Sequence, residues 1–457
     1  MPIQWLKSFL KARLDIQSQI LAKNASWMFV ANSASVFSLF IQSIILGRFL
    51  GPELFGVYVL VTAVVETVQE ALNPNADSAV VKYAAEFRAS ERFELIVGFI
   101  KLAFLIMLAG ASLSVLVIAI LSYVAGEYFF QTQGLAPYAL LFAAGRSLTM
   151  FDNIGMGLLR VFDRFRFNSI LRIILVTLDL IVVLVVALAS NARVEVVLVA
   201  MTATLVVGSC VRNLAAIIEL RKYLWPYRGA RLQLLKDRTR EIRNFMVSNS
   251  LSKTLKTGMN RLDFVLLGTI SGTPSAVGVY AIAKKLASSI AVVADPLIVS
   301  VYPQLSALVA RRAQAEIKGM LRKASTGIAI VAVPLWLALV ALGKPFIGLA
   351  YGDPFVPAYW PVLILSASLF SAYSVFWAVP LLLSLGRAST RFRIDLVSTV
   401  MWLGLILALV PSFGAVGSAV AYGVCVSLMH ALYVTRGLKT LALNVVPAEK
   451  PVSHEPV

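Results

Sequence analysis

Long apolar stretches recur from one end of this chain to the other, separated by short polar connections. A helix needs about 20 mostly apolar residues to cross the hydrocarbon core of a bilayer. The chain is 59% apolar and 14% charged, whereas a soluble domain holds about 25% charged residues. The sequence therefore indicates an all-α integral membrane protein. Twelve spans are predicted, at residues 25–47, 55–75, 95–124, 135–158, 167–190, 194–220, 245–270, 277–303, 324–350, 359–385, 392–413 and 415–436.

The connections between these spans alternate between basic and nearly neutral. Most lysine and arginine residues outside the spans precede the first span or follow the even-numbered spans, whereas the opposite side has only Arg48, Arg193 and Lys344. Because cytoplasmic connections are enriched in Lys and Arg, both termini are predicted to be cytoplasmic. The net charge of +18 then reflects membrane orientation, and nucleic acid is not expected as a partner.

Short sequence patterns occur twice in the chain. VANSAS at 30–35 returns as VSNSLS at 247–252, and LGRFLGPELFGVY at 46–58 returns as LGTISGTPSAVGVY at 267–280. Each copy contains six predicted spans, so both copies enter the membrane from the same side. They are expected to be related by a pseudo-two-fold axis along the membrane normal, with a central cleft between two lobes.

This duplication also predicts how the chain is divided into domains. Two six-helix lobes are joined in the cytoplasm by a basic linker. The first apolar run is too long for the core of a signal peptide, so it is expected to be retained. The predicted parts are an amphipathic or basic leader at 1–24, an N-lobe at 25–220, the linker at 221–244, a C-lobe at 245–436 and a cytoplasmic tail at 437–457.

Several segments resemble bacterial polysaccharide flippases of the multidrug/oligosaccharidyl-lipid/polysaccharide exporter superfamily. The likeness covers nearly the whole chain. It is clearest in LGRFLGPELFGVYVL (46–60), LLGTISGTPSAVGVYAIAKKL (266–286), LAYGDPFVPAYWPVLIL (349–365) and SLGRASTRFRIDLVSTV (384–400).

This resemblance implies a two-lobed transporter in the bacterial cytoplasmic (inner) membrane. Its substrate would be a polyprenyl-pyrophosphate-linked oligosaccharide, moved from the cytoplasmic to the outer leaflet for surface polysaccharide synthesis. Alternating access with proton or cation coupling is implied as well. The expected partners are this lipid-linked oligosaccharide and membrane lipids, with polysaccharide polymerase machinery as an open further partner, and the chain is expected to act as a monomer.

Cations inside the predicted spans are candidates for binding the pyrophosphate. A charged residue facing lipid at the bilayer centre costs about 2.5–3.5 kcal/mol, a cost that largely disappears in a wet cleft. Alternatives remain open, because lysines near a helix end can snorkel to the surface and the other cations can form internal ion pairs, with Asp152 as a possible partner of Arg146. The candidates are Arg146, Lys253, Lys256, Arg261 and Lys284.

Carboxylates inside the spans are candidates for ion coupling. Glu66, Glu70 and Asp77 are spaced so that they share one face of a helix, with Thr62 and Asn73. Burial and a like-charged neighbour both raise the pKa of a carboxyl group, so such a pair holds a proton more readily. The alternative is that these acids neutralise cations of the opposite lobe. Asp295 is a further candidate, on nearly the same face of its helix as Lys284.

Two competing functions remain. An antiporter of small drugs is the first alternative, although a site for cationic drugs is expected to contain acids and aromatics rather than arginine and lysine. A membrane sugar polymerase or ligase is the second, although the outer connections are short. No Walker motif, GxGxxG turn or metal-ligand cluster occurs in the sequence, so we expect a transporter without catalytic residues, cofactor or metal.

Overall fold

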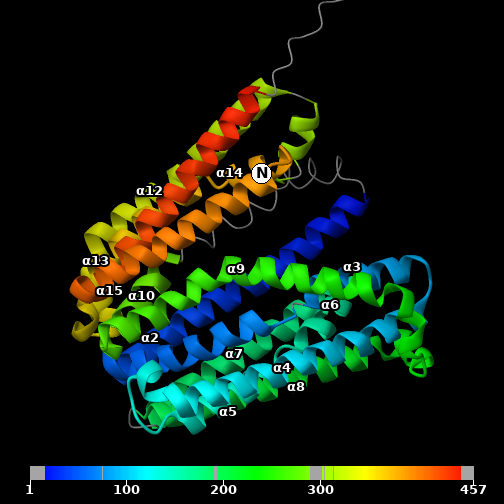
Figure 1. The fold of residues 1–457 in the computed structure, drawn as a ribbon, viewed down its shortest axis with the longest axis horizontal. Helices are drawn as coiled ribbons and strands as arrows, with labels where there is room; N and C mark the ends of the chain where they lie inside the picture. The colour runs from blue at the N-terminus through cyan, green and yellow to red at the C-terminus, as the bar shows by residue number, and fades with distance from the viewer. Residues whose placement is uncertain are drawn as a thin grey trace, which may run out of the picture. The chain divides into compact units, whose positions relative to one another are not determined.

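The computed structural model describes residues 16–74, 76–189, 193–288, 301–302, 304–311 and 313–443. Within these ranges, side chains are described except at residues 16–25, 232, 237, 247–260 and 388. The chain divides into two compact units, residues 1–278 and 279–457 (Figure 1). Each unit has its own core of buried apolar side chains.

Helices and short turns make up all of the described residues, and no strand occurs among them. The prediction of an all-α, multi-pass membrane protein is therefore confirmed. Seven helical stretches in this part of the chain are long and apolar enough to cross a membrane, namely Ser26–Ala89, Phe93–Phe130, Phe165–Ala189, Val194–Tyr227, Gln314–Tyr351, Asp353–Ser384 and Ser389–Ala442.

Two of these stretches are too long for a single crossing. Ser26–Ala89 has 64 residues and Ser389–Ala442 has 54, and at 1.5 Å per residue a straight helix of either length would extend for about 80 Å or more. Helix α2 (Ile16–Leu72) turns at Gly51, where φ is 69°, and α15 (Ala388–Leu443) turns at Gly414, where φ is 51°. Glycine adopts positive φ without steric penalty, so each glycine divides one long helix into two.

The two copies of the repeated LGRFLGPELFGVY pattern lie against each other within the first unit. The second copy joins α9 (Thr239–Ser271) to α10 (Pro274–Ser288). A methyl group on Gly56 would overlap the backbone carbonyl of Pro274, and one on Gly278 would overlap the carbonyl of Pro52. Pro52 and Gly56 are the sequence counterparts of Pro274 and Gly278, so the contact is reciprocal. Backbones approach this closely only where there is no Cβ.

The core of the first unit lies where four helices meet, α3 (Ala76–Ala89), α4 (Phe93–Phe130), α6 (Asp152–Val161) and α8 (Val194–Leu224). Tyr83, Phe99 and Leu159 are fully buried there. Helices α3 and α6 run side by side (Figure 1). The region that follows the second predicted span is thus a packed part of the unit.

The linker after α8 is also packed against this core. It contains two short helices, η1 (Trp225–Tyr227) and η2 (Leu232–Arg238). Leu235 is buried next to Gly98 of α4. Lys101 Nζ donates hydrogen bonds to the carbonyl oxygens of Arg228 at 2.9 Å and Ala230 at 2.8 Å. These contacts bring the start of α9 to the core of the first unit.

Two predicted spans are interrupted rather than continuous. The span predicted at 135–158 consists of α5 (Ala136–Leu148) and α6, with a turn at 149–151. The span predicted at 359–385 consists of α13 (Tyr359–Ser374) and α14 (Ala378–Ser384), with a turn at 375–377. The two broken spans hold corresponding places in the two copies of the repeat.

The second predicted span ends earlier than its apolar pattern suggested. Helix α2 stops at Leu72, before Pro74. A residue preceding proline is disfavoured in the helical region, and proline itself has no amide hydrogen to donate. Asn73 is therefore outside the helix and Asp77 lies in the first turn of α3. The predicted single face running from Thr62 to Asp77 does not extend to these two residues.

The second unit packs α12 (Gln314–Tyr351), η3 (Asp353–Ala358), α13 and α14 with α15. Trp377 is the last residue of the turn that breaks the tenth predicted span, and its Nε1 donates a hydrogen bond to Ser325 Oγ at 2.8 Å. Trp402 of α15 is fully buried. A helix break supported by a buried, hydrogen-bonded aromatic side chain is a defined feature of this unit.

Candidate functional site

A carboxylate between two guanidinium groups forms a charged cluster in the first unit. Glu66 Oε2 of α2 lies 2.6 Å from Arg261 Nη1 of α9. Its other oxygen, Oε1, lies 3.7 Å from Arg146 Nη2 of α5. We refer to these three residues as the Glu66 cluster. It joins three helices that are far apart in the sequence.

Neighbouring contacts hold the members of this cluster in place. Gln69 lies one turn after Glu66 on α2 and is 4% exposed. Its Nε2 donates hydrogen bonds to the Ala143 carbonyl at 2.8 Å and to Ser147 Oγ at 2.9 Å, so α2 is fixed against α5 next to Arg146. Arg146 Nη1 also donates to Thr149 Oγ1, at the break after α5, at 3.3 Å.

The cluster has a net charge of +1 when all three groups are ionised. The side chain of Glu66 is 19% exposed, whereas those of Arg146 and Arg261 are 36% and 45% exposed. Charge-assisted bonds between arginine and a carboxylate are strong, and arginine forms similar forked bonds to phosphate. The arrangement therefore has an excess of positive charge beside one weakly exposed carboxylate, which is chemically suited to attract an anion.

The face of α9 that is open differs from the one the sequence suggested. By their spacing in the sequence, Asn249, Lys253, Lys256, Asn260 and Asp263 are predicted to share one water-facing side of this helix, with Arg261 off that side. Asp263 is fully buried, and Arg261 reaches Glu66. The predicted alternative of an internal ion pair therefore describes the observed contact of Arg261. Lys253 and Lys256, earlier on the same helix, fall outside the described side chains.

The remaining candidate residues lie elsewhere. Glu70 is half-buried, one turn after Glu66, and Asp77 forms an ion pair with Arg160 of α6. In the second unit, Lys284 Nζ lies over the ring of Tyr422, 4.8 Å from its centroid. Asp295 falls outside the described residues. The structure thus brings Glu66, Arg146 and Arg261 together, and Asp77 and Lys284 are placed in other contacts.

Asp152 was expected as a possible partner of Arg146, and this expectation is wrong. Asp152 is 9% exposed and accepts bonds from Arg212 Nε at 2.7 Å, Ser209 Oγ at 2.6 Å and Asn213 Nδ2 at 2.7 Å. These donors all come from α8, and the break between α5 and α6 directs Asp152 toward them. Sequence reasoning missed this network because no helical spacing relates residues of different helices.

A second polar contact that sequence reasoning missed joins α2 to α7 (Phe165–Ala189). Gln42 Nε2 donates to Asp179 Oδ2 at 2.9 Å, and Ser38 Oγ donates to the Val176 carbonyl at 3.1 Å. Both donors sit on the buried side of α2. The sequence did contain a signal for this contact, because Ser38 and Gln42 are polar residues four positions apart in an otherwise apolar helix.

Ion pairs tie helices together at the basic end of the first unit. Arg238 at the end of η2 pairs with Glu86 of α3 and, at 3.1 Å, with Glu241. Hydrogen bonds from Arg238 and then from the Tyr83 hydroxyl hold the pKa of Glu241 below its ordinary value. A lowered carboxyl pKa stabilises the folded state near neutral pH, and this contribution is lost as the pH falls through the lowered pKa.

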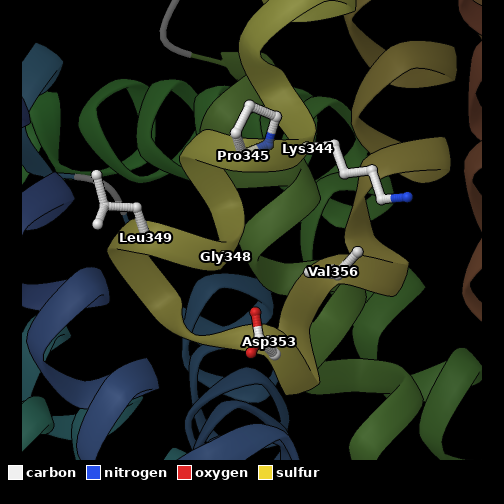
Figure 2. A pocket seen from close by; sticks show the side chains of 6 residues that line it. All are labelled: Lys344, Pro345, Gly348, Leu349, Asp353 and Val356. Atoms are coloured by element: carbon white, nitrogen blue, oxygen red, sulfur yellow. The ribbon is translucent and has the colours of Figure 1, made fainter.

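An open groove of about 550 Å³ lies at the end of α12 in the second unit. Figure 2 shows Lys344 and Asp353 on opposite sides of it, with Gly348 between them. None of the predicted site residues lines this groove. The groove therefore shares no residue with the Glu66 cluster. Within the described residues, no group of three histidine, cysteine, aspartate or glutamate side chains is placed to hold a metal ion.

Comparison with known proteins identifies the family of the chain. A family model described as "Polysaccharide biosynthesis protein" matches residues 45–359. The chain belongs to this polysaccharide biosynthesis family. The matched region contains all three residues of the Glu66 cluster.

A curated relative of this family member is the "Probable low-salt glycan biosynthesis flippase Agl15" of Haloferax volcanii. The two are 24% identical over 179 residues, which is 38% of this chain and 37% of the relative. The aligned region therefore spans well under half of the relative's length.

Solved structures support the fold of the polysaccharide biosynthesis family member. A multidrug resistance MATE transporter of the MOP superfamily, in an inward-facing conformation, has a TM-score of 0.72 at 14% identity, covering 90% of this chain and 95% of that one. Lipid II flippase MurJ, inward closed, has a TM-score of 0.66 at 12% identity, covering 91% and 89%. The Vibrio cholerae transporter VcmN has a TM-score of 0.57 at 15% identity, covering 93% and 98%. At these identities the likeness concerns the fold.

Proposed function

We propose that this protein is a flippase for polyprenyl-pyrophosphate-linked oligosaccharide, moving it from the cytoplasmic to the outer leaflet for surface polysaccharide synthesis. The observation that carries the proposal is the Glu66 cluster. Two partly exposed arginines, both in spans predicted from the sequence, share a single carboxylate. Because an unbalanced positive charge is costly in a bilayer, such a site favours a transient anionic ligand.

The family and its relatives support the same substrate class. The family model is described as polysaccharide biosynthesis, and the archaeal relative is named a glycan biosynthesis flippase. MurJ, with which this chain shares its fold, is named a lipid II flippase. These names point to glycans carried on lipids, which have a pyrophosphate or phosphate between sugar and lipid.

The proposed mechanism is a competition between Glu66 and the substrate for the same two arginines. Ionised Glu66 neutralises part of their charge. When Glu66 is protonated, Arg146 and Arg261 are released to bind the pyrophosphate, because an arginine fork fits phosphate as well as carboxylate. Loss of the proton later restores the internal ion pairs and displaces the substrate. Proton binding and substrate binding are thereby coupled, and no catalytic residue is required.

The membrane organisation proposed for this activity follows the internal repeat. Twelve spans form two six-helix lobes, residues 25–220 and 245–436, around a central cleft, with both termini in the cytoplasm and the protein in the bacterial inner membrane. Lys253, Lys256 and Lys284 are further candidates for binding the substrate, as predicted from the sequence. Glu70, Asp77 and Asp295 are further candidates for ion coupling, and the chain acts as a monomer.

Complementation of cells that lack their own polysaccharide flippase tests this function. We expect the wild-type protein to restore surface glycan and Arg146→Gln to lower it by about tenfold or more, since arginine bonds to phosphate are charge-assisted. Arg193→Gln is the matched control, because Arg193 is exposed at the start of α8, away from the cluster. Full restoration by Arg146→Gln at equal protein levels would remove the cluster from the mechanism.

A second candidate function is antiport of small drugs, which the structural likeness to a MATE transporter favours. The net positive charge of the Glu66 cluster repels cationic drugs, so we expect no protection against them. Measuring the growth of drug-sensitive cells that express the protein separates the two functions. Resistance that is lost in Glu66→Gln, without any restoration of surface glycan, would favour the antiporter.

A further inference from the structure

One face of α8 is apolar and exposed along the second half of the helix. Its exposed apolar side chains follow one another at spacings of four, three and four residues and are Val207, Val211, Leu214 and Ile218. At 100° per residue, these four side chains lie within about 60° of one another around the helix. Helix α8 belongs to the stretch Val194–Tyr227, which is long and apolar enough to cross a membrane. This face of α8 is therefore suited to contact acyl chains.

The same face ends in a charged and an aromatic residue. Arg221 follows Ile218 by three residues and Trp225 follows Arg221 by four, so both continue the apolar face. Ala216 and Leu220, on the opposite side of α8, are buried in the core of the first unit. Trp225 keeps helical backbone angles, and its amide donates a hydrogen bond to the carbonyl oxygen of Arg221. With 48% of its surface accessible, Trp225 is placed where tryptophan is enriched in membrane proteins, at the level of the lipid headgroups.

Two guanidinium groups lie over the ring of Trp225. The Cζ atom of Arg221 is 5.2 Å from the ring centroid, and the Cζ atom of Arg228 is 4.6 Å from it. Both distances are within the range of about 6 Å for a cation–π contact. Glu219, the acidic residue closest in sequence, is paired with Arg164, and within the described side chains neither Arg221 nor Arg228 forms an ion pair. Two uncompensated positive charges therefore meet at one aromatic ring.

Contacts with α4 hold the backbone on the Arg228 side of this ring. Lys101 Nζ donates hydrogen bonds to the carbonyl oxygens of Arg228 at 2.9 Å and Ala230 at 2.8 Å. The ring of Tyr227 stacks on that of Phe93, with the two centroids 5.6 Å apart. Because these contacts exist before any ligand arrives, less conformational entropy is lost when Arg228 binds one.

We propose that Arg221, Trp225 and Arg228 bind the headgroup phosphate of an anionic phospholipid. The apolar face of α8 contacts the acyl chains, the ring of Trp225 lies where the chains meet the headgroup, and the edges of the two guanidinium groups donate to the phosphate. An anionic lipid such as phosphatidylglycerol is favoured over a zwitterionic one, because basic residues next to a membrane span are attracted to negative lipids. The site shares no residue with the Glu66 cluster and does not depend on what the protein transports.

Tryptophan quenching in vesicles tests this site on the full-length protein. The protein is reconstituted in phosphatidylcholine, and phosphatidylglycerol with brominated acyl chains is mixed in stepwise, because bromine quenches the tryptophans that these chains touch. The difference between wild type and Trp225→Phe isolates the Trp225 signal. Arg221→Gln and Arg228→Gln are the test variants, each measured with and without Trp225→Phe. Quenching of every variant by brominated phosphatidylcholine shows whether it is inserted and folded.

Lys236→Gln is the matched control. Lys236 is an exposed cation of the same linker, but it belongs to η2 and is not one of the two cations over the Trp225 ring. Its replacement removes the same charge from the same side of the first unit. A general loss of positive charge and a loss of this particular site are thereby separated.

We expect Trp225 to prefer phosphatidylglycerol over phosphatidylcholine by about tenfold or more. Arg221→Gln and Arg228→Gln should each lower this preference by about fivefold, and Lys236→Gln should change it by less than about twofold. Equal quenching of Trp225 by the two lipids in the wild type overturns the proposal, and so does an unchanged preference in both folded arginine variants. Loss of the preference on addition of excess glycerol phosphate would identify a site for a free anion and overturn the assignment to a membrane lipid. A protein that fails to restore surface glycan but keeps the preference would retain this site and lose the proposed flippase function.

Discussion

Glu66 differs from an ordinary structural ion-pair partner because it faces two arginines and not one. A carboxylate that loses its only cation inside a protein is left as an uncompensated charge, at a cost of about 3–5 kcal/mol. Here either Arg146 or Arg261 can leave Glu66 while the other stays. One arginine can therefore rotate toward a ligand without leaving the carboxylate unpaired. This property suits a transporter, which must release what it binds.

Removing the charge of Glu66 is expected to strengthen substrate binding and slow release. In Glu66→Gln the two arginines are no longer partly neutralised, so prenyl pyrophosphate should bind about tenfold tighter, which corresponds to about 1.4 kcal/mol. Turnover in proteoliposomes should fall by a similar factor. Calorimetry and a fluorescence assay of lipid flipping measure the two quantities. Glu53→Gln is the control, because Glu53 is an exposed residue of the same helix just after its turn at Gly51. Equal turnover in both variants would contradict the competition mechanism.

The members of the site were predictable from the sequence, but their pairing was not. Glu66, Arg146 and Arg261 stand out because charged residues are rare in apolar spans. Helical spacing relates only residues of the same helix to one another. It predicted that Asp263 faces water and that Arg261 lies off that face. The structure shows the reverse, because Asp263 is buried and Arg261 is half-exposed and pairs with Glu66. Likewise, spacing could not connect Asp152 to Arg212. Pairing depends on which helices pack together, and a local pattern does not contain that information.

At the scale of elements, the two copies of the repeated pattern pack against each other, a contact that the sequence alone did not predict. Pro52 and Gly56 meet Pro274 and Gly278 in a reciprocal backbone contact. Each proline starts a helix, where its missing amide hydrogen carries no penalty, and each glycine permits the partner's carbonyl to approach. The same residues are thus retained in both copies because each copy forms half of the contact.

Adding one methyl group at this contact should destabilise the protein. In Gly56→Ala the new Cβ overlaps a backbone carbonyl, which cannot move aside as a side chain would, and overpacking of this kind costs about 1–3 kcal/mol. A lower melting temperature in detergent is the expected result. Gly404→Ala is the matched control, because its Cβ would have no neighbour within 4 Å and alanine favours a helix by up to about 1 kcal/mol. Equal melting temperatures for the two variants would show that the contact is not tight.

At the scale of the whole molecule, charge distribution and backbone turns can be compared within the first unit. Its predicted neutral connections contain the turns at Gly51 and Gly134, both with positive φ. The opposite connections contain the ion pairs of Arg164 and Arg238. Tight glycine turns on one side and charged, paired connections on the other are consistent with a bundle whose basic side faces the cytoplasm.

This orientation can be tested by labelling single cysteines in intact cells with a membrane-impermeant maleimide. In a background with Cys210 and Cys425 replaced by serine, Gln133→Cys lies in a predicted outer connection and Ser90→Cys in a predicted cytoplasmic one, and both positions are exposed. We expect Gln133→Cys to be labelled in intact cells and Ser90→Cys only after the cells are permeabilised. The positive-inside bias acts through short connections close to the spans, as both of these are. Labelling of Ser90→Cys in intact cells would reverse the orientation, and with it the side from which the proposed lipid-linked substrate reaches the Glu66 cluster.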